Sequence, residues 1–457
     1  MQPIANSTDH KDRQHLLHPN ANARLHEAEG ALEIAAGDGI YVIDHSGKRY
    51  IEALSGLWCA GLGFSEKRLV RAATRQMEQL PYYHLFTNKV TGPAADLAER
   101  LLEIAPVPMR KVFLTSSGSE ANDTAIKMIW FRSNAMGRPQ KKKLIARVGG
   151  FHGVTIGAGS LTGIPANQKG FDLPIAGVFH VSKPHYWRNC LAGETEEAFS
   201  TRMAQELEDL ILREGSETVA AFFAEPVMGG GGVILPPATY WAKIQAVLRK
   251  YDVLLVADEV ICGFGRTGKM FGSQTYDIKP DIMVVSKQLS SAYMPIAAVL
   301  ISNHVYQPLA DGSAALGLFG HGLTAGGHPT AAAVALETLR IIETDGLVER
   351  ARLSGDHLRH RLEELRDHPL VGEIRSVGLL AGIEMVYDRA TKAAFGAVGD
   401  LGRRLNPLLQ DRGLILRVIG DTIALCPPLI TTPAEIDLIV DRLQDGLAAL
   451  TDQIAHP

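Results

Sequence analysis

The sequence has few cysteines, and none of them are spaced as a pair. Cys59, Cys190, Cys262 and Cys426 are scattered over 457 residues, and no C-x-x-C motif occurs. This pattern provides neither a disulfide framework nor the thiolate ligands of a zinc site, so no metal centre is indicated. A reducing compartment is therefore expected.

An excess of charge of one sign is also lacking. The 46 Lys and Arg residues against 50 Asp and Glu residues give a net charge of -4. Binding to nucleic acids or to membrane surfaces depends on concentrated positive charge, so neither is expected as a partner. The chain has no apolar run of about 18 residues, and its first residues lack the apolar core of a signal peptide. These absences predict a soluble, cytoplasmic protein that acts on small molecules.

The segment 258–270, DEVICGFGRTGKM, contains an incomplete phosphate-binding motif. It matches the G-x-x-x-x-G-K part of a P-loop, but Met270 follows Lys269 where a P-loop has the Ser or Thr that binds Mg²⁺. Residues 271–280 show no helical period, so no helix N-terminus is expected to face a phosphate there. We expect an ordered loop, and a P-loop nucleotide-binding protein is the alternative of a different class.

Short apolar runs alternate with helical patterns through the middle of the chain. The run at 111–117 is followed by helical spacing over 119–133. Further runs typical of buried strands occur at 143–148, 219–227, 253–260, 281–287 and 296–302, and 237–251 is typical of a helix that begins at a proline. The alternation predicts an α/β fold with a mostly parallel sheet covered on both faces.

The length of the chain and a change of pattern predict two domains. After about residue 328, long amphipathic helices are separated by short strands, which is typical of a smaller α+β domain. Residues 41–52 read as a β-hairpin, which we expect to join this domain. We therefore predict an N-terminal segment 1–70 that is part of the small domain, a large domain 71–327 and a C-terminal small domain 328–457.

Polar residues stand at four predicted strand ends, where α/β sheets bind ligands. The positions are Ser117-Gly118-Ser119, Glu225, Asp258 and Lys287. The first group opens a helix, so its free N-H groups, its two hydroxyls and the helix dipole favour an anion. The other interpretation is a helix cap alone, for which one such residue is enough.

Asp258 and Lys287 each follow an apolar run, so both side chains are expected to be largely desolvated. One interpretation is a buried ion pair between neighbouring strands. The other joins the two residues through a cofactor, because a lysine in an apolar pocket loses its proton readily and condenses with aldehydes, while a pyridine nitrogen requires a carboxylate. With the anion site added, the aldehyde, ring nitrogen and phosphate of pyridoxal 5'-phosphate are all provided for.

Six motifs resemble, in order and spacing, the class III aminotransferases of the aspartate-aminotransferase fold. They are FLTSSGSEANDTAIK, GGFHG, AEPVMGGGGVILPP, LLVADEVICGFGRTGKMF, PDIMVVSKQLS and TAGGHP. The incomplete P-loop belongs to this pattern. The segments LSGLWCAGLGF, LPYYHLF and LILRVIGD are most similar to the ω-amino acid:pyruvate and amine:pyruvate aminotransferases. The resemblance implies pyridoxal-phosphate fold type I, with a large domain around a mostly parallel sheet and a smaller α+β domain.

The resemblance also implies a role for each candidate residue. Lys287 would be the base that binds the cofactor covalently, and Asp258 would bind the ring nitrogen. The implied phosphate ligands are Ser117, Gly118 and Ser119, with Thr324 reaching in from the neighbouring subunit. The ring would lie between Val260 and Phe151, beside His152 and Glu225. The substrate would contact Trp58, Phe86, Phe151 and Arg417.

A site that uses Thr324 of a neighbouring subunit implies a homodimer, alone or paired into tetramers. Arg417 is implied to bind a substrate carboxylate, and Glu225 to neutralise it when no carboxylate is bound. Each role has a structural alternative, since Trp58 and Phe86 are typical of a core and Arg417 of an exposed strand end.

The implied reaction transfers an amino group from an ω-amino acid or primary amine to a keto acid, expected to be pyruvate. Other activities of the same fold stay open, namely 4-aminobutyrate or diamine aminotransferase, aminomutase and decarboxylase. Two positions depart from the family pattern. Gln288 replaces the glycine that many relatives have, and we expect it to press on the cofactor. Ala325 replaces a frequent tyrosine, which we expect to enlarge the pocket at the subunit boundary.

Overall fold

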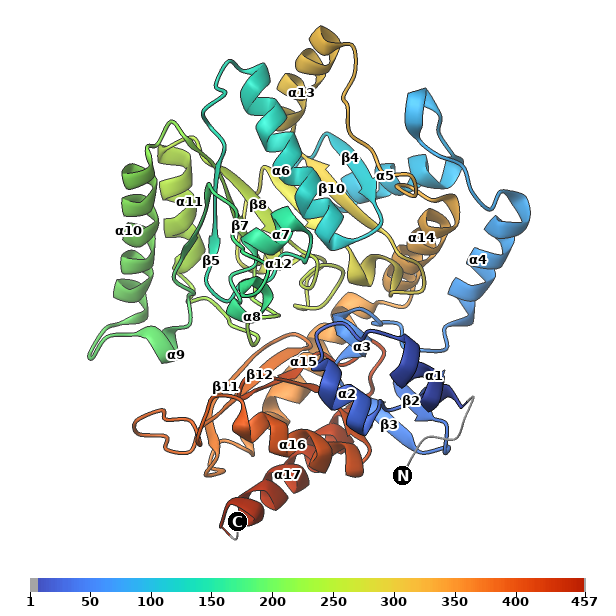
Figure 1. The fold of residues 1–457 in the computed structure, drawn as a ribbon, viewed down its shortest axis with the longest axis vertical. Coiled ribbons are helices and arrows are strands. Elements are labelled where there is room, and N and C mark those ends of the chain that lie inside the picture. Colours follow the sequence, from blue (N-terminus) through green and yellow to red (C-terminus); the bar gives the residue numbers. More distant parts are fainter. Residues whose placement is uncertain (1–6, 456–457) are drawn as a thin grey trace.

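A seven-stranded sheet forms the centre of the larger part of the molecule (Figure 1). The computed structural model describes residues 7–455, so the ends of the predicted terminal segments, 1–6 and 456–457, lie outside it. The strand order is β4-β10-β9-β8-β7-β5-β6, and only β10 runs antiparallel to its neighbours. The strands are β4 (Lys111–Thr115), β5 (Lys143–Arg147), β6 (Val178–Val181), β7 (Val219–Ala224), β8 (Leu254–Asp258), β9 (Ile282–Val285) and β10 (Ala297–Ile301). The predicted mostly parallel sheet is therefore confirmed.

Helices cover both faces of this sheet, which explains why every residue of β7 to β10 is buried. One face packs against α6 (Gly118–Ala135) and α13 (Asn303–Leu316), and the other against α10 (Glu196–Glu214) and α11 (Tyr240–Lys250). The prediction that a proline begins the helix at 237–251 is wrong, because α11 begins at Tyr240. A further layer is formed by α14 (Pro329–Thr344), which packs on α4 (Lys67–Gln79) and α5 (Gly92–Ile104).

The C-terminal part contains a four-stranded antiparallel sheet in the order β11-β12-β15-β14. The strands are β11 (Val371–Val377), β12 (Leu380–Met385), β14 (Arg417–Ile419) and β15 (Thr422–Leu425). It is accompanied by α15 (Leu347–Glu363), α16 (Asp400–Asp411) and α17 (Pro433–Ala455), which lie below the large sheet in Figure 1. This arrangement confirms the expected smaller α+β unit.

The predicted hairpin is formed by β2 (Tyr41–Asp44) and β3 (Arg49–Glu52). It belongs to a second small sheet with β1 (Ile34–Asp38), and β3 pairs in parallel with β13 (Leu414–Ile415). The hairpin is thus linked to the C-terminal part through β13, while the division into 1–70, 71–327 and 328–457 stays a prediction. Among residues 7–455, no helix combines the length and the apolar composition that crossing a membrane requires.

Candidate active site

A cavity of about 110 Å³ lies where β7, β8 and β9 end and α6 begins. The carboxyl ends of parallel strands meet at one edge of a sheet, which brings segments that are far apart in the sequence to the same place. The cavity is lined by Gly118, Ser119, Phe151, His152, Gly153, Glu225, Asp258, Val260, Ile261, Ser286 and Lys287. Most of the predicted cofactor residues, Asp258 and Lys287 among them, therefore line one cavity.

Asp258 is buried at the end of β8 and is held by three donors. Its Oδ2 accepts a hydrogen bond of 2.9 Å from Asn122 Nδ2 and lies 2.8 Å from His152 Nδ1, while its Oδ1 accepts from the N-H of Val260 at 3.1 Å. Asn122 also donates to the carbonyl of His152 at 2.7 Å. These bonds fix the orientation of the carboxylate, because rotating it would leave buried donors without acceptors.

Asn122 was not among the site residues predicted from the sequence. The residue is fully buried and lies four positions after Gly118, on the same face of α6. Its position could have indicated a role in the site, because Asn122 is a polar residue on the inward face of a helix that begins at an anion site. A buried amide requires hydrogen-bond partners.

Lys287 begins η2 (Lys287–Ser290), directly after β9 and Ser286. Its backbone has a φ of 42°, a left-handed conformation that is strained for a residue with a side chain. Burial lowers the pKa of the Lys287 amine, and the nearby Asp258 opposes this shift. An amine in this environment is deprotonated more readily, which is the state that attacks a carbonyl carbon.

Glu225 lies in the same cavity and is held by backbone donors. Its carboxylate accepts from the N-H of Phe151 at 3.1 Å and from that of Gly229 at 3.0 Å, and burial raises its pKa. Within residues 7–455, the half-buried Arg417 on β14 has no ion-pair partner, and burial lowers its pKa. Glu225 therefore does not form the ion pair with Arg417 that the resemblance implied.

The start of α6 combines a helix cap with an anion site. Ser117 Oγ accepts from the N-H of Glu120 at 3.2 Å and so caps the helix, and it is not part of the cavity wall. Gly118 and Ser119 do line the cavity, and the N-H groups of a first helical turn have no partner within the helix. A Cβ on Gly153 would lie 2.6 Å from Ser119 Oγ, so the wall beside this site admits no side chain.

These features fit pyridoxal phosphate. The first turn of α6 suits its phosphate, the Asp258 carboxylate suits a pyridinium nitrogen, and the Lys287 amine suits an aldehyde. The buried Nε2 of His152 lacks a hydrogen-bond partner among residues 7–455 and is free for a ligand in the cavity.

Trp58, Phe86 and Thr324 lie outside this cavity. Trp58 ends α3 (Ser55–Trp58), is only 2% exposed, and packs in an apolar cluster with Ile261. Phe86 is 46% exposed and begins η1 (Phe86–Asn88). Thr324 is exposed, and its carbonyl accepts a hydrogen bond of 2.8 Å from Tyr82.

The two departures from the family pattern also lie outside the cavity wall. Ala325 is exposed, whereas Gln288 is fully buried against Gly61. The Oε1 of Gln288 accepts from Arg266 Nη2 at 3.3 Å. Gln288 therefore packs against another segment of the chain and not against the cavity, which differs from the expectation that it presses on a bound cofactor.

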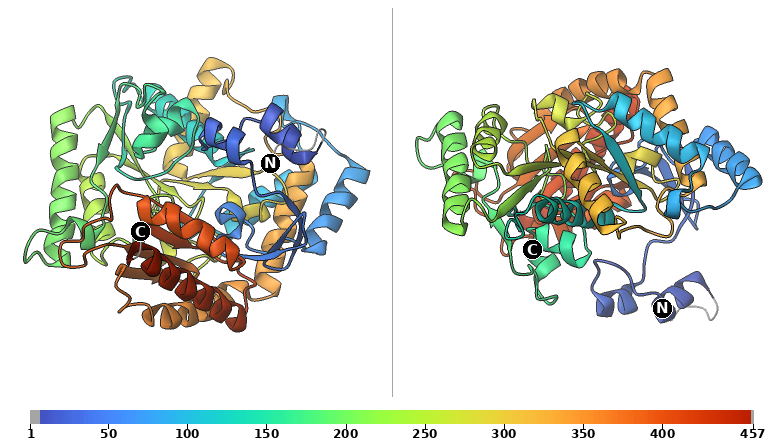
Figure 2. Two further views of the ribbon diagram at one scale, coloured as in Figure 1. Left: turned by 60° about the horizontal axis from the view of Figure 1, so that its bottom comes forward. Right: turned by 90° about the horizontal axis from the view of Figure 1, so that it is seen from above.

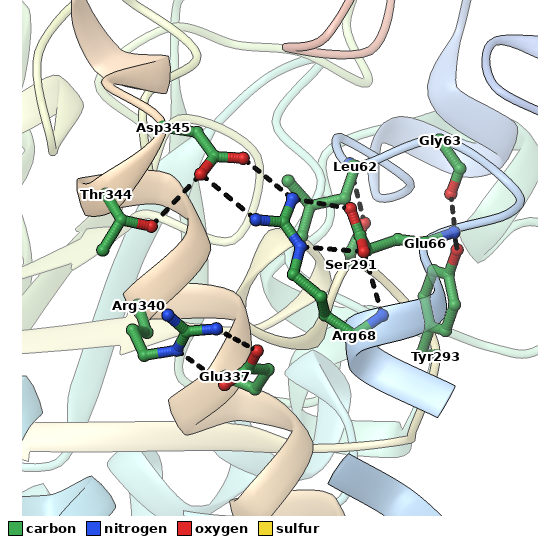
Figure 3. A network of polar contacts seen from close by, with 10 residues as sticks. All are labelled: Leu62, Gly63, Glu66, Arg68, Ser291, Tyr293, Glu337, Arg340, Thr344 and Asp345. Atoms are coloured by element: carbon green, nitrogen blue, oxygen red, sulfur yellow. Dashed lines mark hydrogen bonds and ion pairs between the residues drawn. The ribbon is translucent and has the colours of Figure 1, made fainter. Parts of the chain in front are cut away.

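The segment after Trp58 and the segment after Lys287 also meet in a seam beyond this contact, and Figure 3 shows the hydrogen bonds of this seam between Leu62–Glu66 and Ser291–Tyr293. Ser291 Oγ accepts from the N-H of Leu62 at 2.9 Å. The hydroxyl of Tyr293 accepts from the N-H of Glu66 at 2.7 Å and donates to the carbonyl of Gly63 at 3.2 Å. The seam therefore makes the position of one segment depend on the other.

The incomplete P-loop does not form a phosphate site. A short helix, α12 (Gly272–Thr275), follows the loop, so the prediction that no helix follows is wrong. The buried carboxylate of Glu259 already accepts from the N-H groups of Gly272 at 2.9 Å and Ser273 at 2.6 Å. The donors that a phosphate would use are therefore occupied.

The fold and the cavity together define a pyridoxal-phosphate enzyme of fold type I. Residues 25–447 match the family Aminotransferase class-III. The chain is 51% identical over 410 residues to the mitochondrial gamma aminobutyrate transaminase 1 of Solanum lycopersicum, and the match covers 90% of this chain and 80% of that protein. The chain belongs to the class III aminotransferases, which are pyridoxal-phosphate-dependent enzymes.

Solved structures agree closely with this assignment. The omega transaminase of Pseudomonas jessenii in complex with PMP is 57% identical, with a TM-score of 0.98, over 98% of this chain and 99% of that chain. A thermostable omega transaminase variant, W58M/F86L/R417L, engineered for asymmetric synthesis of enantiopure bulky amines, has the same identity and TM-score, over 98% of this chain and 100% of that chain.

One expectation is contradicted by these relatives. The sequence predicted a cytoplasmic protein, whereas the tomato relative is a mitochondrial protein. The absence of an apolar signal core therefore did not determine the compartment, because it excludes only one kind of targeting segment.

Proposed function

We propose that this chain is an ω-transaminase that transfers the amino group of an ω-amino acid or a primary amine to pyruvate. The observation that carries the proposal is the convergence of Asp258, Lys287 and the first turn of α6 on one cavity. The tomato relative supports 4-aminobutyrate, itself an ω-amino acid, as a second candidate donor.

The proposed chemistry assigns separate tasks to the residues of the cavity. When bound, pyridoxal phosphate supplies an electrophilic aldehyde carbon and a ring that accepts electrons from the substrate carbon. The first turn of α6 binds the phosphate, and Asp258 holds the positive charge of the ring nitrogen. Nζ of Lys287 takes the proton from the substrate carbon that carries the amino group. Asn122 and His152 keep the Asp258 carboxylate in position for this task.

We assign the substrate pocket to Trp58, Phe86 and Arg417. The engineered omega transaminase variant changes residues of these three types at the same numbers to obtain bulky amine products, which supports the assignment. Arg417 has no carboxylate partner within the described chain, so its guanidinium is available to a keto acid. Phe86 and Thr324 are exposed on the single chain, which supports a homodimer in which each chain completes the site of the other.

The test is an absorbance experiment on the purified holoenzyme. A primary amine without a carboxylate, or 4-aminobutyrate, is expected to bleach the visible cofactor band, and pyruvate is expected to restore it. Restoration by 2-oxoglutarate but not by pyruvate would assign a different acceptor. Release of CO₂ during turnover would instead identify a decarboxylase.

A further inference from the structure

The first described residues form a small unit that stands apart from the rest of the fold (Figure 2). It consists of α1 (Thr8–His15) and α2 (Ala23–Glu29), and neither helix buries a residue. Helices of this length are not stable in water on their own, and no apolar core holds this pair together. The polar contacts between α1 and α2 therefore determine how they are arranged.

Three side chains of this unit converge at one point. Asp12 comes from α1, His26 from α2, and His18 from the connection between them. Their ligand atoms all lie within 4.8 Å of one another. His18 Nε2 lies 2.7 Å from Oδ1 of Asp12, and His26 Nε2 lies 3.2 Å from Oδ2.

The position of His26 is not explained by a hydrogen bond. The His26 side chain is only 10% exposed, and within residues 7–455 its buried Nε2 has no hydrogen-bond partner, although Asp12 is close. Two ligand atoms of a tetrahedral Zn²⁺ ion, each about 2.0–2.1 Å from it, are separated by about 3.3 Å. The spacing of 3.2 Å between His26 and Asp12 is that of two ligands of one ion. His18 lies closer to Asp12, at the 2.7 Å of a hydrogen bond, and would exchange this bond for the ion.

We propose that Asp12, His18 and His26 bind a divalent transition-metal ion, and that this ion joins α1 to α2. Imidazole and carboxylate ligands favour Zn²⁺. Three protein ligands leave one tetrahedral position for water. The local charge is favourable, because Arg13 is paired with Asp9 and Asp12 is left to balance the cation. Four of the 16 histidines lie between residues 10 and 26, which is typical of a metal-binding segment.

A second cluster shows what such a group looks like without a metal. His185, Glu373 and Glu384 also lie close together, but Arg375 pairs with both carboxylates at 2.6 and 3.0 Å. The positive charge that a metal would supply is already present there. No Lys or Arg side chain forms an ion pair with Asp12 in the described part of the chain.

The experiment titrates Zn²⁺ into the chelator-treated holoenzyme by calorimetry, and Co²⁺ by its visible absorption. One bound ion per chain is expected. Replacing His26→Gln or Asp12→Asn is expected to weaken binding by more than about tenfold. His10→Gln and His15→Gln are matched controls in the same segment and are expected to bind as the wild type does.

Metal binding at this site also has a structural readout. The ion is expected to slow proteolysis between α1 and α2 in the wild type but not in His26→Gln, with transamination activity unchanged in both. Absence of stoichiometric binding, or equal losses in the His10 and His26 variants, would overturn the proposal. Equal losses would show that the histidine-rich segment binds metal without the defined ligand set.

Discussion

Asn122 and Asp258 are 136 residues apart in the chain, and the side-chain amide of one donates to the carboxylate of the other at 2.9 Å. We expect Asn122→Ala to weaken cofactor binding by about 10- to 150-fold, because a hydrogen bond to a charged group contributes about 1.5–3 kcal/mol. The dissociation constant of the cofactor, followed by absorbance, measures the effect. Asn134→Ala, an exposed position at the other end of α6, is the control. Equal affinity in Asn122→Ala and the wild type would show that Asp258 needs no support from Asn122.

Lys287 is the group to which we assign proton transfer. We expect Lys287→Ala to lower turnover by at least about 10²- to 10⁴-fold, while the cofactor still binds through its phosphate. Single-turnover kinetics and the ratio of bound cofactor to protein test both parts. Lys269→Ala removes the lysine of the incomplete P-loop and is expected to leave the rate unchanged. Normal turnover in Lys287→Ala would remove the basis of the proposed chemistry.

Replacing Arg417 is expected to affect the KM of the keto-acid acceptor more than the KM of the amine donor. In Arg417→Leu, the KM for the keto acid should rise by about 10- to 150-fold, since a charged hydrogen bond to its carboxylate is lost. The KM for a primary amine without a carboxylate should change little. Steady-state kinetics with each substrate varied in turn measure this difference, and Arg403→Leu on α16 is the control. A parallel rise in both KM values would point to a general disturbance of the pocket.

The effects of substitutions at Gln288 and Gly61 on the free energy of unfolding are expected to depend on each other. A Cβ on Gly61 would lie 2.0 Å from Gln288 Oε1, so Gly61→Ala should lower the free energy of unfolding by about 1–3 kcal/mol. Adding Gln288→Ala should restore part of this loss because it removes the clashing amide. Denaturant unfolding of both single variants and the double variant provides the cycle. Additive losses would show that the two side chains do not interact.

Glu52 is expected to make stability depend on pH. Burial raises its pKa from 4.5 to about 7, so the folded protein favours the protonated form. Its contribution is fully present below the unfolded pKa of 4.5 and is lost as the pH rises through about 7, a change of about 3 kcal/mol. Glu52→Gln cannot ionise, so its free energy of unfolding should vary less over this window. Urea midpoints measured from pH 4.5 to 8 test this, with exposed Glu217→Gln as the control.

The sequence predicted the strands of the large sheet well because they are uninterrupted apolar runs. Such a run is typical of a strand that is buried on both faces, as β7 to β10 are. Elements with weaker patterns were missed, among them β6 and the N-terminal helices. After residue 328 the pattern indicated short strands without their pairing, and β11 and β12 form a hairpin that turns at Gly378.

The cavity was predicted for a similar reason, since Asp258 and Lys287 end buried strands. What the sequence did not determine is which distant side chains support them. Asn122 reaches Asp258 only because α6 packs on the sheet over β9 and β10, and Gln288 contacts Gly61 only after the two segments are folded together. Local periodicity holds no information about such long-range contacts.

The seam between the Leu62 and Ser291 segments has a consequence for anyone who redesigns this enzyme. Because these bonds join the segment after Trp58 to the segment after Lys287, we expect a replacement at Trp58, in the proposed substrate pocket, to disturb the turn that holds the lysine as well. Changes in substrate size and in rate are then expected to occur together. Variant libraries that change both segments together should yield active combinations of substitutions that are not found when the segments are changed one at a time.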